Sequence, residues 1–391
     1  MSYAFSLDDV EYLRGPAGRA AIAEIAARPL TDLIADVAAA RAVAGERGAA
    51  VLETAMLRRK AAVRLANADD WLFTDPALQQ ATATPVAEHR AQRLAGRDVH
   101  DVTCSVGADL AVVARVAHRA IGSDLDPVRL AMARNNCGPE VPLLRADALR
   151  PVTRGTVVVA DPARRDDSGR RRWRPADLLP RLDLLAEVYA GRELAVKCSP
   201  GLDFAAVEWA DEVELVSLDG AVREACLWTG DLAGVHRRAT CLSQRTGRDG
   251  TQWTITDAEP DDSPVLPIGE WIVDPDGAVV RAGLVRHYAV RHGLGQLDPR
   301  IAYLTGDEPP PGIRAFRVLE HGKYSEKALR ATLRARSVGT LEILVRGLDV
   351  DPNTLRKRLK LAGETSATVV LTRVGDTPTA IVCEAVRTVG T

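Results

Sequence analysis

The sequence lacks several patterns that assign a chain to a particular protein class. It has six cysteines among 391 residues, and none of them forms a Cys-x-x-Cys pair or accompanies a histidine-rich segment. We therefore expect no disulfide framework and no metal site. Its first residues show no basic segment followed by an apolar one, which argues against export. It contains no run of about 18 apolar residues, which argues against a membrane-spanning helix. These absences predict a soluble cytoplasmic protein with reduced thiols.

Lysine is scarce as well. The 51 basic residues include only six lysines, and the net charge is −2. Attraction to nucleic acid must therefore come from local patches and not from the field of the whole molecule. Arginine suits phosphate because its guanidinium pairs bidentately with it, although coding bias explains the arginine excess more simply.

The length favours two or three domains. The first 75 residues are rich in Ala, Leu, Arg and Glu at helical spacing, and Pro29 and Gly45 divide them into two or more helices. A polar, proline-rich stretch later in the chain predicts a linker or an exposed hairpin. The expected organisation is a helical region at 1–75, a central domain at 76–244, a linker at 245–269 and a second α/β domain at 270–391.

The central domain has the sequence pattern of an α/β fold. Between residues 97 and 228, short β-rich runs alternate with segments able to form crossover helices. This pattern predicts a mostly parallel, doubly wound sheet with helices on both faces. Ligands bind such sheets beyond the carboxyl ends of the strands. The segments predicted to carry chemistry are 101–109, 124–126, 147–148, 161–165 and 197–200.

The C-terminal part predicts a second α/β unit. Residues 270–285 suggest two short strands around Pro275, Asp276 and Gly277, followed by a helix. Further strands are expected at LEILVRG and ATVVLTRV, around a helix in DPNTLRKRLKLAG.

The first strand of the central domain ends in a tight turn. A helix begins directly afterwards, so the turn presents backbone N–H groups at the positive end of the helix dipole. Close approach of a ligand needs small residues, and Ser105, Gly107 and Ala108 supply them.

Aspartates end four successive strands, at Asp101, Asp124, Asp147 and Asp161. Asp124 is placed to accept the hydroxyls of a ribose, and Asp147 could accept from an exocyclic amine. Helix capping explains one such aspartate, but four in succession indicate one shared ligand site.

These motifs follow a specific order. D-x-x-C-S-x-G-x-D is followed by SDLDP, RADAL and DPARR, and this order resembles class I S-adenosylmethionine-dependent methyltransferases over about residues 76 to 232. The resemblance includes a late antiparallel pair, EVELVSL and REACLWTG. The C-terminal part resembles the THUMP-like domain fused to such enzymes. The resemblance implies a Rossmann-like methyltransferase sheet, an N-terminal helical region, a C-terminal α/β THUMP-like domain, and S-adenosyl-L-methionine as cofactor.

The resemblance also implies roles for single residues. Asp101 and the turn from Thr103 through Ser105 to Gly107 would hold the methionine end of the cofactor, and Asp124 would hold its ribose.

The remaining roles fall on the next strand ends. Leu125 would pack on the adenine, and Asp147 with Ala148 would meet its amino edge. Asp161 and Pro162 would face the reacting methyl group.

Two positions depart from the family pattern. Ser105 stands where glycine is usual, which could reduce cofactor affinity. Ala163 and Arg164 replace the second proline and the aromatic residue typical of enzymes that methylate exocyclic amines, which puts that chemistry in doubt.

The DPAR sequence is closer to the Asp-Pro-Pro-Arg of uracil-5 RNA methyltransferases. Those enzymes end the fifth strand in Ser-Cys-Asn-Pro, and here Lys197-Cys198-Ser199-Pro200 stands. A Cys198 thiolate, its pKa lowered by Lys197, could add to a pyrimidine. The alternative is a small buried hydrophobe that ends a core strand. The candidate catalytic residues are Asp161, Pro162, Arg164 and Cys198.

Two basic segments predict RNA contacts. Residues Arg164–Arg174 contain six arginines and Trp173, and Arg356–Lys360 place four basic residues on one short helix. A solvated loop or helix face explains either segment equally well. We predict methyl transfer to a tRNA or rRNA base, with the THUMP-like domain aiding RNA binding. The alternatives are an RNA-binding module whose methyltransferase domain is weak or inactive, and a nicotinamide-dependent Rossmann enzyme, disfavoured because G-x-G-x-x-G is missing.

Overall fold

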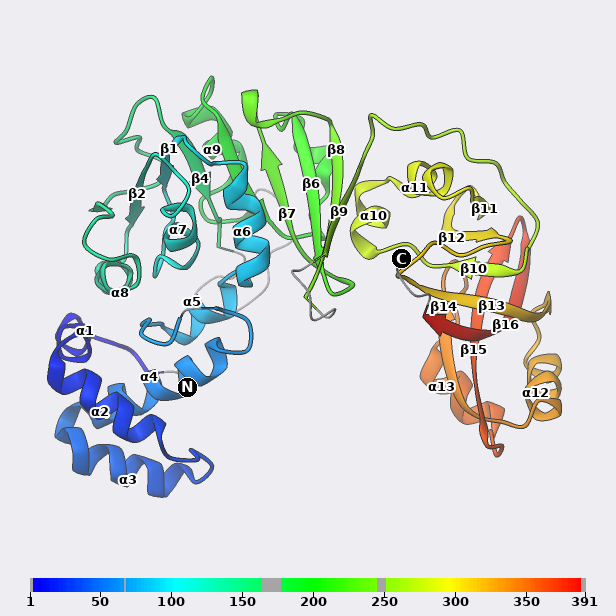
Figure 1. The fold of residues 1–391 in the computed structure, drawn as a ribbon, viewed down its shortest axis with the longest axis horizontal. Coiled ribbons are helices and arrows are strands. Elements are labelled where there is room, and N and C mark those ends of the chain that lie inside the picture. Colours follow the sequence, from blue (N-terminus) through cyan, green and yellow to red (C-terminus); the bar gives the residue numbers. More distant parts are fainter. Residues whose placement is uncertain (1–2, 67, 164–176, 245–250, 388–391) are drawn as a thin grey trace. The chain divides into compact units, whose positions relative to one another are not determined.

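The computed structural model describes residues 3–66, 68–163, 177–244 and 251–387. Its contacts divide the chain into two compact units (Figure 1). The first contains residues 1–236 and 242–251, and the second contains residues 237–241 and 252–391. Among the described residues, no helix has both the length and the apolar composition needed to cross a membrane.

The first unit begins with the predicted helical region. Its helices are α1 (Leu7–Arg14), α2 (Pro16–Ala26), α3 (Leu33–Ala44), α4 (Gly48–Ala61), α5 (Asp75–Gln80) and α6 (Thr84–Gln92). Ser6 and Asp9 form a capping box at the start of α1. Pro29 lies between α2 and α3, and Gly45, at φ +55°, ends α3. The expected division into several helices is confirmed.

A nine-stranded sheet follows. Its strands are β1 (Asp98–Asp101), β2 (Arg119–Asp124), β3 (Leu143–Arg145), β4 (Val157–Ala160), β5 (Leu194–Cys198), β6 (Glu212–Leu218), β7 (Ala221–Trp228), β8 (Arg237–Ser243) and β9 (Thr251–Thr256). Their order is β3-β2-β1-β4-β5-β7-β6-β8-β9. Strands β1 to β7 belong to the first unit, whereas residues 237–241 of β8 and 252–256 of β9 are assigned to the second. Strands β1 to β5 pair in parallel, whereas β7 pairs antiparallel with β5 and β6. The doubly wound sheet and the late antiparallel pair are confirmed, and the strand order reverses between β1 and β4.

Helices α7 (Ala108–Val113), α8 (Pro127–Cys137) and α9 (Leu182–Val188) connect the parallel strands. Ala195 of β5 belongs to the buried cluster that α6 and α7 form with the sheet. Side chains alternate between the faces of a strand, so Lys197 leaves β5 on the α6–α7 side and Cys198 on the other side. Lys197 and Cys198 are therefore neighbours in sequence but lie on opposite faces of the sheet.

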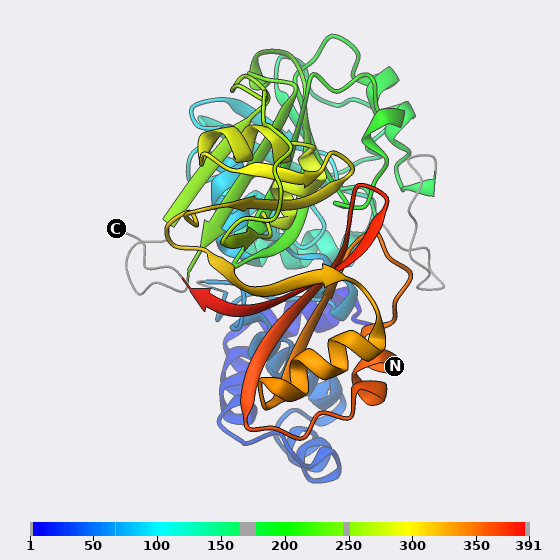
Figure 2. The same cartoon turned by 90° about the vertical axis from the view of Figure 1, so that its right-hand side faces the viewer.

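The second unit contains a seven-stranded sheet with order β11-β12-β10-β13-β16-β15-β14. Its strands are β10 (Trp271–Val273), β11 (Gly295–Asp298), β12 (Ile301–Gly306), β13 (Arg314–Lys323), β14 (Val338–Val345), β15 (Thr365–Val374) and β16 (Thr377–Arg387). Its helices are α10 (Gly277–Ala282), α11 (Val285–Arg291), α12 (Glu326–Ala335) and α13 (Pro352–Leu359). Leucines of α12 and α13 share one buried cluster with β14 and β15, and Figure 2 shows α12 across these strands.

One predicted strand is wrong. The segment after Pro275 folds as helix α10 and not as the second strand of a hairpin. The Asp276 side chain accepts a hydrogen bond from the backbone N–H of Ala278 at 2.8 Å and so caps the helix. Strands at LEILVRG and ATVVLTRV and the helix between them are confirmed.

Candidate functional site

Hydrogen bonds join the residues at the carboxyl ends of the parallel strands β1 to β4. We call this edge of the sheet the ledge. The backbone N–H of Ser105, after β1, donates to Asp124 Oδ2 at the end of β2 at 3.0 Å. The N–H of Asp161, after β4, donates to Thr103 Oγ1 at 2.7 Å. The N–H of Ala146, after β3, donates to the carbonyl of Asp124 at 3.3 Å. The predicted cofactor-binding segments are therefore neighbours in space.

The turn after β1 is held in an unusual backbone conformation. Ser105 has φ +51°, in the left-handed region that glycine adopts most easily. Gly107 has φ +77°, and a Cβ added there would lie 2.5 Å from Cys137 Sγ. Asp101 Oδ1 accepts the N–H of Thr103 at 3.1 Å and fixes the start of the turn. The turn thus combines a strained serine with a position that only glycine fits.

The edge beside β2 and β3 pairs carboxylates with an exposed apolar side chain. Leu125, next to Asp124, is 60% exposed. Asp147 follows β3, and the buried Ala148 beside it accepts a hydrogen bond through its carbonyl from the Tyr189 hydroxyl at 2.7 Å. An exposed leucine flanked by polar groups offers an apolar surface with hydrogen-bonding atoms at its rim.

A buried lysine lies at the end of β5. Lys197 Nζ is 2.5 Å from Asp161 Oδ2 and 3.2 Å from Asp109 Oδ2, and it donates to Thr82 Oγ1 at 2.8 Å. Burial lowers the lysine pKa, but the Asp109 and Asp161 carboxylates outweigh it and raise the pKa above its usual value. Lys197 therefore remains an ammonium that holds two carboxylates in place.

Arg90 of α6 completes this ion cluster. Its guanidinium lies 2.9 Å from Asp109 Oδ2 and 2.5 Å from Glu224 Oε1 on β7. Burial opposes ionisation of Asp109, but Arg90 and Lys197 outweigh it and lower the Asp109 pKa to about 2. Asp109 Oδ1 is buried and accepts no hydrogen bond from any residue that the structure describes.

The pKa of Asp101 is shifted upward, whereas that of Asp109 is shifted downward. Its side chain is buried, and burial, reinforced by the charges of Asp109 and Asp161, raises its pKa to about 7. The donor that opposes this shift is the N–H of Thr103. Asp109 and Asp161 already have cationic partners in Arg90 and Lys197, whereas no described cation forms an ion pair with Asp101, so a cation placed beside Asp101 would lower its pKa.

The predicted catalytic residues have different surroundings. Asp161 and Pro162 follow β4 on the ledge, whereas Cys198 ends β5 with 1% of its surface exposed. The Lys197 ammonium binds Asp109 and Asp161 on the opposite face of the strand. The nucleophile role of Cys198 therefore stays a prediction. Arg164 and the rest of Arg164–Arg174 lie outside the described residues.

Sequence reasoning missed most of the ion cluster. The family motif contains Asp109 but implies no role for it, and Thr82, Arg90 and Glu224 lie outside the motifs of the sequence. One feature of the sequence does indicate the cluster: Glu224 is a charged residue directly before the four apolar residues that β7 buries, and a charge in an apolar strand needs a partner. Among the described residues, no group of three or more His, Cys, Asp or Glu side chains is arranged to hold a metal ion.

Two segments of the chain match known families, and the chain as a whole is similar to known proteins. Residues 313–385 match the family described as THUMP domain-like, and residues 6–61 match a domain of unknown function. Two curated proteins from Mycobacterium tuberculosis, strains CDC 1551 / Oshkosh and ATCC 25618 / H37Rv, are each 55% identical over 349 residues, covering 86% of this chain and 95% of theirs. Both are described as uncharacterized S-adenosylmethionine-dependent methyltransferases.

A solved structure has the same fold. It is a Porphyromonas gingivalis W83 protein assigned as a methyltransferase, with a TM-score of 0.73 and 18% identity. The match covers 98% of this chain and 100% of that chain, so the whole architecture of helical region, central sheet and C-terminal unit recurs there.

Proposed function

Because this chain belongs to the S-adenosylmethionine-dependent methyltransferases, we propose that it transfers the cofactor's methyl group to a base of tRNA or rRNA at the carboxyl ledge. The observation that carries the RNA acceptor is the THUMP-like segment at 313–385 in the same chain as the methyltransferase sheet.

The described residues fit S-adenosylmethionine. The cofactor carries a sulfonium, an ammonium and a carboxylate, and the ledge offers the Asp101 carboxyl, which has no cationic partner among the described residues, beside the Asp161 carboxylate held by Lys197. Asp109 Oδ1 accepts no hydrogen bond from the described residues, so it can still accept one from a cationic donor. Gly107 keeps the turn free of a Cβ where the turn packs against Cys137 and Ala133 of α8.

We assign the ends of the cofactor to the following residues. Asp101 and the turn from Thr103 to Gly107 hold the methionine end, and Asp124 accepts from the ribose. The two Asp124 oxygens already accept backbone N–H groups, so their orientation is set before a ligand arrives.

The other end of the cofactor would be held at the ends of β2 and β3. Leu125 would cover one face of the adenine, and Asp147 and Ala148 would meet its amino edge. This assignment uses the 60% exposure of Leu125, which a ligand would reduce at a gain of about 25 cal/mol per Å² of apolar surface.

Asp161 and Pro162 would face the methyl group that is transferred. When bound, the cofactor supplies a methyl on sulfur that an acceptor electron pair takes in line, breaking the C–S bond and leaving S-adenosylhomocysteine. Lys197 holds the Asp161 carboxylate at 2.5 Å, so its position does not depend on solvent. Positioning of donor and acceptor supplies most of the catalysis in such a transfer.

The THUMP-like unit offers a basic surface for the acceptor. On α13, Leu355 and Leu359 are buried, and Arg356, Lys357 and Arg358 face solvent. Arg358 lies 3.5 Å from Glu326, but no described carboxylate forms an ion pair with Lys357. Exposed cations on a short helix, such as Lys357, can contact backbone phosphates.

Cys198 is assigned to the reaction only if the acceptor is carbon 5 of a pyrimidine. A Cys198→Ala variant that binds cofactor normally but transfers no methyl would support covalent addition. Undiminished transfer would identify Cys198 as a packing residue, in keeping with its 1% exposure.

The function is tested with radiolabelled S-adenosylmethionine and fractionated RNA from cells that lack the protein. Label in one RNA fraction, mapped to a nucleoside by mass spectrometry, is the expected result. Label in protein or small molecules with unlabelled RNA would contradict the RNA acceptor.

A further inference from the structure

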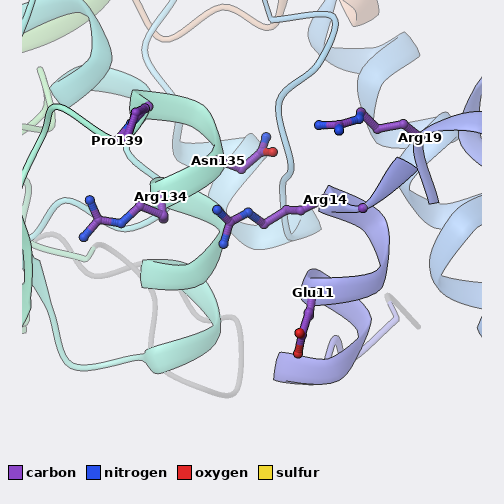
Figure 3. A pocket seen from close by; sticks show the side chains of 8 residues that line it. Glu11, Arg14, Arg19, Arg134, Asn135 and Pro139 are labelled. Carbon is purple, nitrogen blue, oxygen red and sulfur yellow. The ribbon is translucent and has the colours of Figure 1, made fainter. Parts of the chain in front are cut away.

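A pocket in the first unit lies outside the cofactor ledge. It has a volume of about 410 Å³ and is formed by the end of α1, the start of α2 and the end of α8 (Figure 3). Arg14 ends α1 and Arg19 lies in the first turns of α2. Figure 3 shows both side chains extending toward Asn135 on α8.

The two arginines have no internal counterion. Among the described residues, no carboxylate forms an ion pair with Arg14 or Arg19. Glu11 also lines the pocket, but Figure 3 shows its carboxylate pointing away from both guanidinium groups. Arg134 is engaged differently, since its Nη1 donates to the carbonyl of Val141 at 2.9 Å. Arg14 and Arg19 therefore leave bidentate donor sets free for an anion.

Helix α8 links this pocket to the cofactor ledge. The helix is capped by Asp126, whose N–H donates to Asp124 Oδ1 at 2.9 Å, and it runs 11 residues to Cys137. At 1.5 Å per residue its length is about 16 Å. A nucleic-acid strand carries a phosphate about every 3.4 Å along its axis, so about five phosphates span this distance. One strand can thus reach both ends of the helix.

We propose that the Arg14–Arg19 pocket binds backbone phosphates of the RNA substrate, which gives the helical segment 6–61 a role in holding RNA beside the methyl-transfer ledge. The inference rests on the proposed RNA acceptor and adds a binding site to it. Both arginines are solvent-exposed, so their removal leaves the helical core intact.

The test uses the full-length protein and fluorescein-labelled tRNA transcripts, with affinity measured as a function of salt. Arg14→Gln with Arg19→Gln is expected to reduce the slope of log affinity against log salt by about 2, one for each phosphate contact. The matched control is Arg41→Gln with Arg115→Gln, two exposed arginines outside the pocket, which leaves the slope unchanged.

A gain-of-function variant provides a second readout. Glu11→Gln removes the negative charge from the pocket wall and is expected to tighten RNA binding, an effect that a structural role for Glu11 would not produce. Unchanged affinity in this variant would count against the pocket.

The failures are distinguishable. Equal slopes in the pocket and control variants, with wild-type RNA binding intact, overturn the pocket and leave the proposed function standing. Absence of wild-type binding to any RNA overturns both. Inorganic phosphate that binds through Arg14 and Arg19 at millimolar concentration without displacing RNA would reassign the pocket to a small anion and overturn the proposal.

Discussion

Lys197 Nζ lies 2.5 Å from Asp161 Oδ2, so a buried ammonium fixes the carboxylate assigned to the methyl-transfer position. The same ammonium lies 3.2 Å from Asp109. Lys197→Met would leave these carboxylates without one of their cations, and removing one partner of a buried ion pair costs about 3–5 kcal/mol. We expect a loss of that size in the free energy of unfolding, measured by urea denaturation at pH 7.

The matched control for this variant is Lys60→Met. Lys60 pairs with Asp75 at 3.3 Å but is 60% exposed, and exposed pairs contribute about 0–1 kcal/mol. Equal destabilisation by the two variants would show that the Lys197 cluster contributes no more than a surface pair.

Gly107 provides a test of the turn. Its backbone, at φ +77° and ψ +17°, matches that of Gly283, at φ +76° and ψ +21°. An added Cβ meets Cys137 Sγ at 2.5 Å at the first position and nothing within 4 Å at the second. Both alanine variants incur left-handed strain of about 1–2 kcal/mol.

We therefore expect Gly107→Ala to lower the free energy of unfolding more than Gly283→Ala and to weaken cofactor binding, which Gly283→Ala does not. Equal losses of stability with unchanged cofactor affinity would show that the turn tolerates a side chain.

Asp101 predicts a pH dependence. Its pKa in the folded protein is about 7, raised by burial, whereas an unfolded aspartate has a pKa of about 3.9. Between these values the folded state binds the extra proton, so this group makes stability fall as pH rises from about 4 to 7. Asp101→Asn abolishes the effect, and its stability relative to wild type should rise between pH 5 and pH 8.

Cofactor binding should show the reverse trend. A carboxylate attracts the cationic cofactor, so wild-type affinity should increase as pH rises through 7 and the Asp101→Asn profile should be flatter. Thermal unfolding and calorimetry at several pH values measure both quantities. Parallel profiles for the two proteins would show that Asp101 does not titrate near neutrality.

The sequence predicted those parts of the site that depend on strand ends. The carboxyl ends of parallel strands share one edge of a sheet, so the strand pattern alone predicts that Asp101, Asp124 and Asp161 lie close together. The cluster around Lys197 could not, because Arg90 and Glu224 come from α6 and β7, and only the folded sheet brings them to Asp109.

Local competition explains the wrong strand after Pro275. That segment has β-branched residues that suit a strand, but the cap at Asp276 favours helix α10. Lys197 and Cys198 are adjacent in sequence, and side chains alternate along a strand, so the two leave β5 on opposite faces; the nucleophile role of Cys198 stays a prediction.

Calorimetric titration with S-adenosylmethionine measures whether the ledge after β1 to β4 holds the cofactor. Asp124→Ala removes the proposed ribose ligand. Asp126→Ala, two residues later, removes the cap of α8, which accepts from the N–H groups of Val128 and Arg129, and an exposed ion pair with Arg129 at 3.5 Å. We predict that wild type binds, that Asp126→Ala binds equally well with stability reduced by about 1 kcal/mol, and that Asp124→Ala binds at least about tenfold more weakly, about 1.4 kcal/mol. Wild-type affinity in Asp124→Ala, or no binding by wild type, would contradict the account.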